Sequence, residues 1–333
     1  GGLGGRELDT LFIGGGTPSL MGGPGLVALS EALSQWFSLD PEGTEWTVEA
    51  NPASFDRSLA EAWRAAGVNR VSLGVQALDD GALKWLGRLH DGRVAREAVA
   101  TAAEAGFEDI NIDLLFGLPE EVERDLEAEV AEALALPVTH VSLYGLTIEP
   151  RTALARSVRQ GRTRPPGGER YASEYRAACS ALREAGFEHY EVSNFARPGH
   201  QCRHNWSYWK RIPYLGLGPS GHGFLPPYRT WNVFRWDRYE RALRTGAGPL
   251  EGWERPDPGQ RALERIWLGL RTNEGVPARW ESPAARRSLD RWEAAGWMET
   301  RADRLVGTVE GWLRLDAMVA EIAEEEERWR FRR

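Results

Sequence analysis

The sequence is poor in cysteine, lacks long apolar runs and carries no excess of positive charge. Its two cysteines, Cys179 and Cys202, are too few for a disulfide framework and indicate a reducing cytoplasm. No run reaches the roughly 18 apolar residues that a membrane-spanning helix needs, and no signal peptide is visible. The net charge of −8 argues against a nucleic-acid partner. We therefore expect a cytoplasmic protein without a membrane span.

An initiating methionine is also missing, because the chain opens with Gly1-Gly2-Leu3-Gly4-Gly5. We expect that a segment precedes it. The composition that remains is that of a folded protein with an ample core: 333 residues, 42% hydrophobic and 27% charged. This length leaves room for one large domain, or for a barrel with an appendage.

The first half of the chain alternates between strand-like and helix-like segments. Five apolar runs predict strands, at residues 10–14, 45–51, 71–76, 110–115 and 140–146. Helical patterns separate them, at residues 25–37, 54–66, 79–89, 93–105 and 121–134. We expect Leu26, Leu29, Leu33 and Trp36 to share the buried face of the first helix. The alternation predicts right-handed βα units around a parallel sheet.

The predicted strands have one apolar and one polar face. Val48 and Ala50 oppose Thr47, Glu49 and Asn51, because side chains alternate along a strand. Two later strands repeat the pattern, with polar positions at Ser72, Gly74, Gln76, Asn111 and Asp113. Since the crossover helices cover the apolar face, we expect the polar face to line a ligand cavity. The alternative is that these side chains bond to one another as internal struts.

Three glycines follow the first predicted strand, in Gly14-Gly15-Gly16-Thr17-Pro18-Ser19. Without side chains, such a turn lets a carboxylate or phosphate approach the backbone N–H groups. The stretch lacks the Lys-Ser/Thr pair of a P-loop, and its spacing is not G-x-G-x-x-G. The alternative is a tight turn that only requires positive φ angles. Ser19 and Pro24 indicate the start of the following helix.

The remainder of the chain has a different organisation. A breaker cluster at residues 163–168 ends the repeats, and a helix is expected at 169–185, followed by strands at 190–195 and 214–218. From about Pro256 the pattern is helical and resembles a small winged-helix domain. Its expected core residues are Trp267, Leu270, Leu289, Trp292, Trp297, Leu313, Leu315 and Met318. We expect the run from Glu324 to Arg333 to be a solvated helix end.

The segment His204-Asn205-Trp206-Ser207-Tyr208-Trp209 places a histidine, an amide and three aromatic rings in six residues. A neutral imidazole can bind a metal axially, and the rings provide a flat wall for a planar macrocycle. The alternative is an aromatic loop in which His204 makes a structural hydrogen bond. His222 lies in a glycine-rich turn and by itself is uninformative. Cys179 falls within a helical pattern and is expected to be buried and inert.

Several of these motifs resemble radical S-adenosylmethionine (SAM) proteins of the oxygen-independent coproporphyrinogen III oxidase type. The resemblance runs from Asp9 to about Gly223 and returns at residues 268–271 and 311–316. It rests on the triple-glycine stretch and on residues 49–52, 72–76, 111–119 and 142–144. It implies a partial (β/α)6 barrel, open and polar inside and without its first strand, which would leave the 10–14 strand as an open edge. The segments would then be a barrel core (1–150), an extension containing His204–Trp209 (151–250) and a helical domain (251–333).

The resemblance also implies which residues bind SAM. Gly15, Gly16 and Thr17 would receive its methionyl amino and carboxylate groups, and Glu49 and Arg88 would pair with that charged end. Gln76 and Asp113 would hydrogen-bond the sugar region, and Thr147 would lie beside the adenine. From the residues alone, we would interpret Arg88 as the solvated end of a helix.

Within this family, H-N-x-x-Y-W marks the branch of heme chaperones. The match at His204, Tyr208 and Trp209 therefore implies heme binding, with delivery to an acceptor protein that the sequence does not identify. The rival function is that of an oxygen-independent coproporphyrinogen III dehydrogenase, an enzyme of porphyrin biosynthesis. Whether this chain is an enzyme at all is left open.

One family feature is absent from the chain. The family holds a [4Fe-4S] cluster on a C-x-x-x-C-x-x-C loop, and neither Cys179 nor Cys202 lies in such a run. We expect this loop to fall before Gly1 in a complete protein; the alternative is a lineage that has lost the cluster. The chain as given has no cluster ligands, and we assign it no reductive cleavage of SAM.

Overall fold

The computed structural model describes residues 6–278 and 283–330. By its internal contacts the chain divides into two compact units, residues 1–204 and residues 205–333. Each unit is described by itself. The functional division into segments 1–150, 151–250 and 251–333 stays a prediction.

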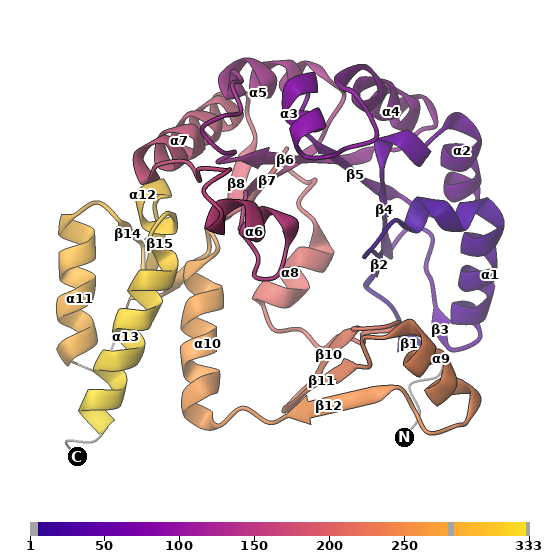
Figure 1. The fold of residues 1–333 in the computed structure, drawn as a ribbon. Helices are drawn as coiled ribbons and strands as arrows, with labels where there is room; N and C mark the ends of the chain where they lie inside the picture. Colours follow the sequence, from indigo (N-terminus) through magenta and orange to yellow (C-terminus); the bar gives the residue numbers. More distant parts are fainter. Residues whose placement is uncertain (1–5, 279–282, 331–333) are drawn as a thin grey trace. The chain divides into compact units, whose positions relative to one another are not determined.

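The first unit is built around a curved seven-stranded sheet, which confirms the predicted partial α/β barrel (Figure 1). In spatial order the strands are β2 (Thr10–Ile13), β4 (Glu45–Ala50), β5 (Arg70–Gln76), β6 (Asp109–Phe116), β7 (His140–Gly145), β9 (Asn194–Ala196) and β8 (Glu188–Glu191). The first five are parallel, whereas β9 runs antiparallel to both β7 and β8. As expected, β2 forms the outer edge. A two-residue pair, β1 (Arg6–Glu7) with β3 (Phe37–Ser38), lies outside this sheet.

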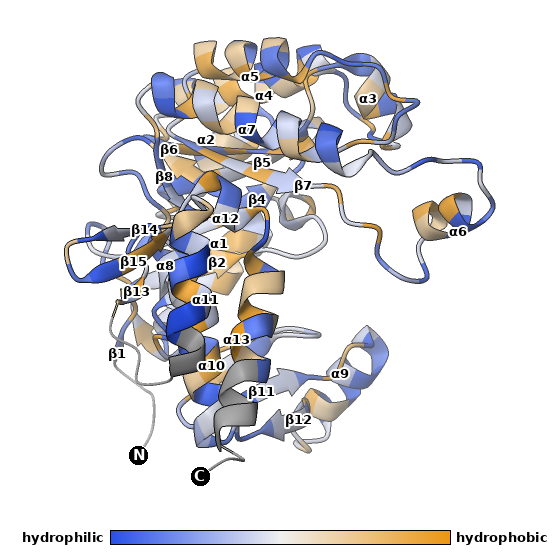
Figure 2. Ribbon diagram, turned by 90° about the vertical axis from the view of Figure 1, so that its left-hand side faces the viewer, coloured by the Kyte–Doolittle hydropathy of each residue, from blue (hydrophilic) through white to orange (hydrophobic). Residues whose placement is uncertain are grey.

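Helices follow the strands, as the sequence predicts. They are a 3-10 turn (Pro18–Met21), α1 (Gly22–Ser34), α2 (Arg57–Ala65), α3 (Asp80–Trp85), α4 (Gly92–Glu104), α5 (Leu126–Ala135), α6 (Ala153–Arg159), α7 (Gly168–Glu184) and α8 (Arg203–Trp209). Four of them begin at an aspartate whose carboxylate accepts a backbone N–H three residues on: Asp56, Asp79, Asp91 and Asp125. Figure 2 shows hydrophobic and hydrophilic residues alternating along α4 and α5, as in helices that cover a sheet.

The strand register confirms that one face of the sheet is polar. Residues that pair across parallel strands lie on the same face, and the pairs Glu49 with Ser72 and Ser72 with Asn111 carry the polar positions from β4 to β6. The opposite face is hydrocarbon, and Val48, Val71 and Ile112 are fully buried there. We call the polar face the lumen face.

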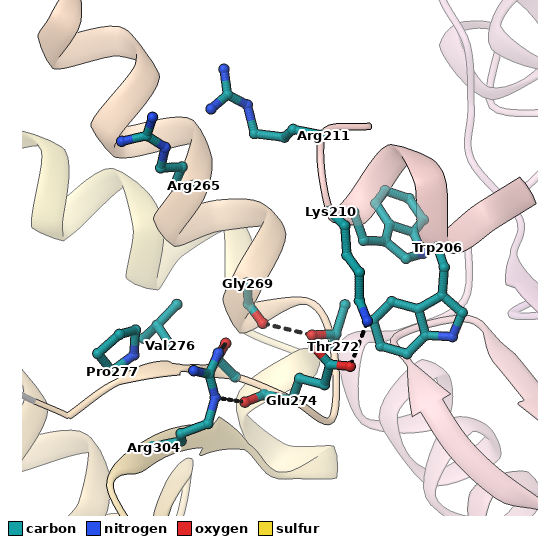
Figure 3. A pocket seen from close by; sticks show the side chains of 12 residues that line it. Trp206, Lys210, Arg211, Arg265, Gly269, Thr272, Glu274, Val276, Pro277 and Arg304 are labelled. Carbon is teal, nitrogen blue, oxygen red and sulfur yellow. Dashed lines mark hydrogen bonds and ion pairs between the residues drawn. The ribbon is translucent and has the colours of Figure 1, made fainter. Parts of the chain in front are cut away.

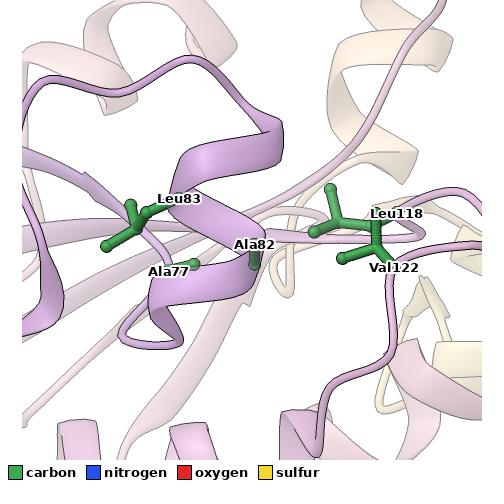
Figure 4. Packing of buried hydrophobic residues seen from close by; sticks show 5 residues of the cluster. All are labelled: Ala77, Ala82, Leu83, Leu118 and Val122. Atoms are coloured by element: carbon green, nitrogen blue, oxygen red, sulfur yellow. The ribbon is translucent and has the colours of Figure 1, made fainter.

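A small apolar cluster supports the loops above the sheet (Figure 4). It joins the segment after β5, α3 and the loop after β6, through Ala77, Ala82, Leu83, Leu118 and Val122. All five side chains are nearly or fully buried. This packing fixes the stretch between Gln76 and Arg88, and so positions two of the predicted ligand residues.

Several predicted elements differ from the structure. Ser19 lies within the 3-10 turn, and Trp36 lies beyond α1 with 64% of its surface exposed. The helix expected from residue 121 begins at Leu126, where Asp125 caps it. The strand expected at 190–195 is the β8–β9 hairpin, and residues 214–218 form only an isolated bridge from Tyr214 to Phe224.

The second unit contains a three-stranded antiparallel sheet and a helical part. The sheet consists of β10 (His222–Leu225), β11 (Tyr228–Asn232) and β12 (Leu250–Glu254), with α9 (Trp236–Arg244) between the last two. Sequence reasoning missed this sheet. The helical part contains α10 (Pro258–Leu270), β13 (Val276–Pro277), α11 (Pro283–Ala294), β14 (Met298–Arg301), β15 (Arg304–Gly307), α12 (Val309–Trp312) and α13 (Leu315–Arg330). The β14–β15 hairpin, with β13 paired to β15, has the element order of a winged helix.

The predicted core of the helical part is largely confirmed. The buried members are Leu270, Leu289, Trp292, Leu315 and Met318. Trp297 and Leu313 are half-buried, and Trp267 is 41% exposed, so its assignment to the core was wrong. The predicted solvated end at 324–333 lies mostly outside the described side chains. Within the described ranges, no helix has both the length and the apolar character needed to cross a bilayer.

Candidate functional site

Three charged side chains converge at the carboxyl ends of the strands. Glu49 lies near the end of β4, Asp113 near the end of β6, and Arg88 in the segment after α3. The charges of Glu49 and Arg88 both act on the carboxyl of Asp113. In parallel α/β folds, ligands bind at this edge of the sheet. Three of the residues predicted to contact SAM are therefore brought into one neighbourhood.

The triple-glycine turn is anchored to this cluster by Glu49. The backbone N–H of Gly15 donates a hydrogen bond of 3.0 Å to Oε2 of Glu49. Gly15 and Gly16 both have positive φ, at 82° and 65°, and no atom lies within 4 Å of the place where either Cβ would be. The turn therefore needs glycine for its backbone and also leaves open space in front of it.

The hydroxyl of Thr17 does not cap the 3-10 turn that follows it. Thr17 is half-buried, beside the exposed Gly16. The contact of Thr17 with SAM therefore stays a prediction.

The carboxyl groups of the cluster are shifted toward their protonated forms. Burial raises the pKa of Glu49, and the Gly15 N–H opposes this effect. Burial raises the pKa of Asp113 to about 7; the Glu49 charge adds to the rise, while hydrogen bonds from Asn111 and Ser142 and the charge of Arg88 oppose it. Burial lowers the pKa of the Arg88 guanidinium, against the opposing effect of Asp113. The site therefore favours a ligand that supplies its own charges and polar groups.

Asp113 also belongs to a polar network on the lumen face. Asn111 Nδ2 donates to Asp113 Oδ1 at 2.9 Å and to Ser72 Oγ at 2.8 Å. The side-chain oxygen Oδ1 of Asn111 lies 2.6 Å from His140 Nδ1, and it accepts a hydrogen bond of 3.1 Å from Ser142 Oγ. Ser72, Asn111 and Asp113 thus bond to one another, as the interpretation as internal struts expects. We call the edge of the sheet at the carboxyl ends of the strands, with Glu49, Gln76 and Asp113, the rim; a ligand cavity there stays a prediction.

Gln76 ends β5 in a strained conformation, with φ of 71° in a residue other than glycine. Its side chain lies over Gly74, where an added Cβ would come within 3.1 Å of Nε2. The register shifts between Leu73 and Gln76, so the strand bends as it reaches the rim. Residues held in such regions of φ/ψ space often occur at functional sites. The ligand role of Gln76 stays a prediction.

Thr147 and Tyr144 lie at or just beyond the end of β7. Thr147 is exposed, and its hydroxyl lies 3.4 Å from the carbonyl of Gly145. Tyr144 is 41% exposed and shares the lumen face with Ser142. Sequence reasoning noted Tyr144 only as part of a motif. The signal in the sequence is the spacing: Tyr144 follows Ser142 by two residues, so both side chains lie on the same face of the strand.

The amino ends of the same strands are closed by an ionic layer. Arg70 bridges Glu45 and Asp109, with Nε to Oε2 at 3.4 Å and an Nη2 bond to Oδ1 at 3.1 Å. Arg70 Nη2 also donates to the carbonyl of His200 at 2.7 Å. Glu45 and Arg70 are at least nine-tenths buried. Sequence reasoning missed this layer, because each member is the first residue of its strand and resembles a solvated strand end.

Residues 204–209, which the alternative interpretation made an aromatic loop, lie in the helix α8, which the sequence did not indicate. The carboxylate of Glu45 accepts the backbone N–H groups of Arg203 and His204, each at 2.9 Å, at the amino end of this helix. A carboxylate there satisfies donors that the helix leaves unpaired and favours the positive end of its dipole. The cap comes from a residue more than 150 positions earlier, so no local signal could reveal it.

His204 is held against the lumen face of the edge strand. Its Nδ1 lies 2.7 Å from the hydroxyl of Thr10, and its ring stacks on Phe12 at 5.1 Å between centroids. Thr10 and Phe12 pair with Glu45 and Thr47 and therefore share the lumen face. Burial lowers the pKa of His204, with the Glu45 charge opposing, so the imidazole is neutral at ordinary pH.

Tyr208 and Trp209 lie on the same helix as His204 but belong to the second unit. There Tyr208 packs edge-on against Tyr214, with centroids 4.8 Å apart, and Arg271 lies 4.4 Å above the ring of Trp209. A common ligand for His204, Tyr208 and Trp209 therefore stays a prediction. His222 is exposed on β10 and faces Trp231.

The cysteines do not fit a cluster site. Burial raises the pKa of the Cys179 thiol to about 12, which agrees with an inert residue of α7. Cys202 is buried, and its Sγ lies 3.5 Å from Glu45 Oε1. Among the described residues, no group of three or more histidine, cysteine or acidic side chains is arranged to hold a metal ion. These residues therefore supply no ligands for a [4Fe-4S] cluster.

Comparisons with known proteins agree with this geometry. The model of the radical SAM superfamily matches residues 3–133. The heme chaperone HemW of Mycobacterium tuberculosis (strain ATCC 25618 / H37Rv) is 39% identical over 313 residues, which cover 94% of this chain and 80% of that protein. The heme chaperone HemW of Bacillus subtilis (strain 168) is 34% identical, over 85% of this chain and 75% of that protein.

A solved structure shares the fold. Coproporphyrinogen III oxidase (HemN) from Escherichia coli, a radical SAM enzyme, matches with a TM-score of 0.77 over 96% of this chain and 78% of that one. The two sequences are 18% identical, so this likeness shows the fold alone. The partial barrel is therefore of the radical SAM type.

Proposed function

This chain belongs to the HemW family of heme chaperones within the radical SAM superfamily, and from that premise we propose that it binds heme and SAM and passes the heme to an acceptor protein. The observation that carries the proposal is the placement of His204. A neutral, half-buried imidazole lies on the lumen face of β2 with Nδ1 beside the Thr10 hydroxyl. Neutral histidine, oriented by a hydrogen bond at its other nitrogen, is a common axial ligand of heme iron.

We assign SAM to the rim at the carboxyl ends of the strands. Gly15, Gly16 and Thr17 would receive its amino and carboxylate groups, with Glu49 and Arg88 at the same charged end. Gln76 and Asp113 would bond the sugar region, and Thr147 would lie near the base. The open space before the glycines and the charge cluster around Asp113 support this assignment.

No chemical step is assigned to an iron–sulfur cluster in this chain. The family implies such a cluster, but Cys179 and Cys202 form no C-x-x-x-C-x-x-C run. The proposal therefore concerns binding and transfer. Heme is the cargo, and Tyr208 and Trp209 would complete its site together with His204.

The function is tested by heme transfer. Protein loaded with hemin is passed through gel filtration and then mixed with apomyoglobin, which serves as a model acceptor. We expect the heme to stay with the protein during filtration and to move to apomyoglobin on mixing, seen as a shift of the Soret band. Loss of heme on the column, or retention in the presence of acceptor, would contradict the proposal.

A second experiment tests the rival function, that of a coproporphyrinogen III dehydrogenase. The protein is incubated with coproporphyrinogen III, SAM and a low-potential reductant, and the porphyrins are separated by chromatography. We expect no product in which a propionate has become a vinyl group. Such a product would favour the dehydrogenase.

A further inference from the structure

The second unit contains a cavity of about 430 Å³ whose lining includes Trp209, a residue of the proposed heme site (Figure 3). One side is formed by the end of α8 and the residues after it, and the other by α10, β13 and β15. Its principal side chains are Trp206, Trp209, Lys210, Arg211, Arg265 and Arg304. The volume falls in the range of small-molecule sites in proteins.

Cations outnumber carboxylates around this cavity. Lys210 pairs with Glu274 at 2.8 Å, and Arg211 pairs with Glu264 at 2.9 Å. Arg304 donates to the carbonyls of Glu274 and Gly275, which hold the guanidinium in place without neutralising it. In the part of the chain that the structure describes, no carboxylate pairs with Arg304 or Arg265. Two guanidinium charges are therefore left uncompensated.

The neighbouring positive charges also affect the pKa of Arg211. Burial lowers the pKa of Arg211, and the charges of Arg265, Arg229 and Arg261 lower it further. The chain as a whole has a net charge of −8, so this concentration of arginine does not follow from composition. An anion in the cavity would relieve the repulsion, as in other sites where arginine forks receive carboxylates.

Two indole rings complete the walls. Lys210 Nζ lies 4.5 Å from the centre of the Trp206 ring, and the Arg271 guanidinium lies 4.4 Å from that of Trp209. The Nε1 of Trp209 is buried and, among the described residues, has no hydrogen-bond acceptor. A buried indole N–H normally finds a partner, so this donor also points to a missing acceptor.

We propose that this cavity binds the two propionate carboxylates of a porphyrin, with Arg265 and Arg304 as their cationic partners and Trp209 as a further donor. The inference rests on the proposed function and adds a site for the acidic edge of the cargo. It predicts that the porphyrin is recognised even without iron, because carboxylates and aromatic walls do not require the metal.

The test uses protoporphyrin IX, which has both propionates and no iron. Its absorbance is titrated against the wild-type chain, Arg265→Gln and the matched control Arg261→Gln. Arg261 lies on the same helix, α10, but does not line the cavity. We expect Arg265→Gln to weaken binding about tenfold, as for the loss of a charged hydrogen bond. Arg261→Gln should change the affinity less than about twofold, because Arg261 does not line the cavity and can make no direct contact with a carboxylate bound there.

Two further probes identify the carboxylates. Protoporphyrin dimethyl ester, which lacks both charges, should bind at least about tenfold more weakly than the free acid, and equally to wild type and Arg265→Gln. Glutarate, a short dicarboxylate, should not displace the porphyrin at equal concentration. Equal affinity for ester and acid, equal effects of the two arginine variants, or displacement by glutarate would each overturn the inference.

The outcome is separate from that of the proposed function. His204→Ala removes the proposed iron ligand and should alter the hemin spectrum, whereas Arg265→Gln should weaken the binding of iron-free protoporphyrin. If hemin binds through His204 but Arg265→Gln behaves like Arg261→Gln, only the cavity assignment fails. If the cavity variants behave as expected and His204→Ala has no effect on hemin, the proposed role of His204 fails instead.

Discussion

The hydroxyl of Thr10 lies 2.7 Å from Nδ1 of His204, so the edge strand of the sheet and the helix α8 meet at the histidine. The two residues are 194 positions apart. For Nε2 of His204 to bind iron, Nδ1 must carry the proton, and the Thr10 hydroxyl is placed to accept a hydrogen bond from that N–H. The first strand of the sheet therefore holds the imidazole of the proposed heme ligand in place.

Replacing Thr10 should weaken heme binding without removing the ligand. Thr10→Val keeps the shape of the side chain but cannot accept from Nδ1, and we expect the hemin affinity to fall about tenfold, as for other residues that orient metal ligands. Thr10→Ser keeps the hydroxyl and should bind as wild type does. The affinities are obtained from Soret titrations. Equal affinities for the valine and serine variants would show that the Thr10 contact does not orient His204.

Asp113 should make stability fall as the pH rises. Its pKa is about 7 in the folded protein, against an ordinary value of 3.8. Between these values the folded state binds more protons than the unfolded state, so the free energy of unfolding decreases with increasing pH. From about pH 5 to about pH 8 the loss should reach up to roughly 3 kcal/mol, because each pKa unit corresponds to about 1.4 kcal/mol.

Urea denaturation of wild type and Asp113→Asn at the two pH values measures this effect. The amide still accepts the hydrogen bond from Asn111 but does not titrate, so the variant should lose less stability on going to the higher pH. A pH dependence that is identical in the two proteins would mean that the Asp113 carboxyl is already ionised at low pH.

Glu45 should be important for stability as well as for the position of His204. Its carboxylate receives two N–H groups of α8 and pairs with the buried Arg70. Glu45→Gln removes the charge beside Arg70, and we expect a loss of about 3 kcal/mol, as for other broken buried ion pairs. The exposed Glu42→Gln is the matched control and should be neutral. A small effect of Glu45→Gln in urea denaturation would show that water can replace the ion pair.

Gly145 is required by the ring of Tyr171, and the structure predicts coupling between the two. A Cβ at Gly145 would collide with the Tyr171 hydroxyl oxygen, and the Tyr171 ring packs on Phe116 with 4.6 Å between the ring centroids. Gly145→Ala should therefore destabilise the protein by roughly 1–3 kcal/mol through overpacking. In the Tyr171→Ala background the same change should cost almost nothing.

The control for this pair is Gly168→Ala, at the first residue of α7, where nothing lies within 4 Å of the added methyl group. Thermal unfolding of the single and double variants gives the coupling energy. If the destabilisation of the double variant equals the sum of those of the two single variants, Tyr171 moves aside freely and does not restrict position 145.

The strands of the parallel sheet and its polar lumen face could be predicted because period-two alternation is local. Thr47, Glu49 and Asp113 each alternate with buried aliphatic residues, so one strand's sequence is enough to assign its faces. The helix α8 could not be predicted, since its cap is Glu45, far away in the chain. The β8–β9 hairpin was read as one strand because its turn, at Val192 and Ser193, contains no glycine or proline.

The other wrong or missing predictions concern exposed aromatic residues and charges that are dispersed along the chain. Trp36 and Trp267 continue an apolar helical stripe, but large aromatic side chains are often left partly exposed. The basic cavity collects side chains from α8, α10 and β15, and no stretch of sequence contains more than a part of it. Such sites are visible only once tertiary contacts bring their members together.

The most direct test of the account is a hemin titration of the wild-type chain, His204→Ala and the control His222→Ala, followed at the Soret band. His222 is exposed on β10, and its removal should change nothing. We predict one hemin bound to each wild-type chain, with a shifted Soret band that is lost in His204→Ala and retained in His222→Ala. An unchanged spectrum and affinity in His204→Ala would contradict the assignment of this histidine as the heme ligand.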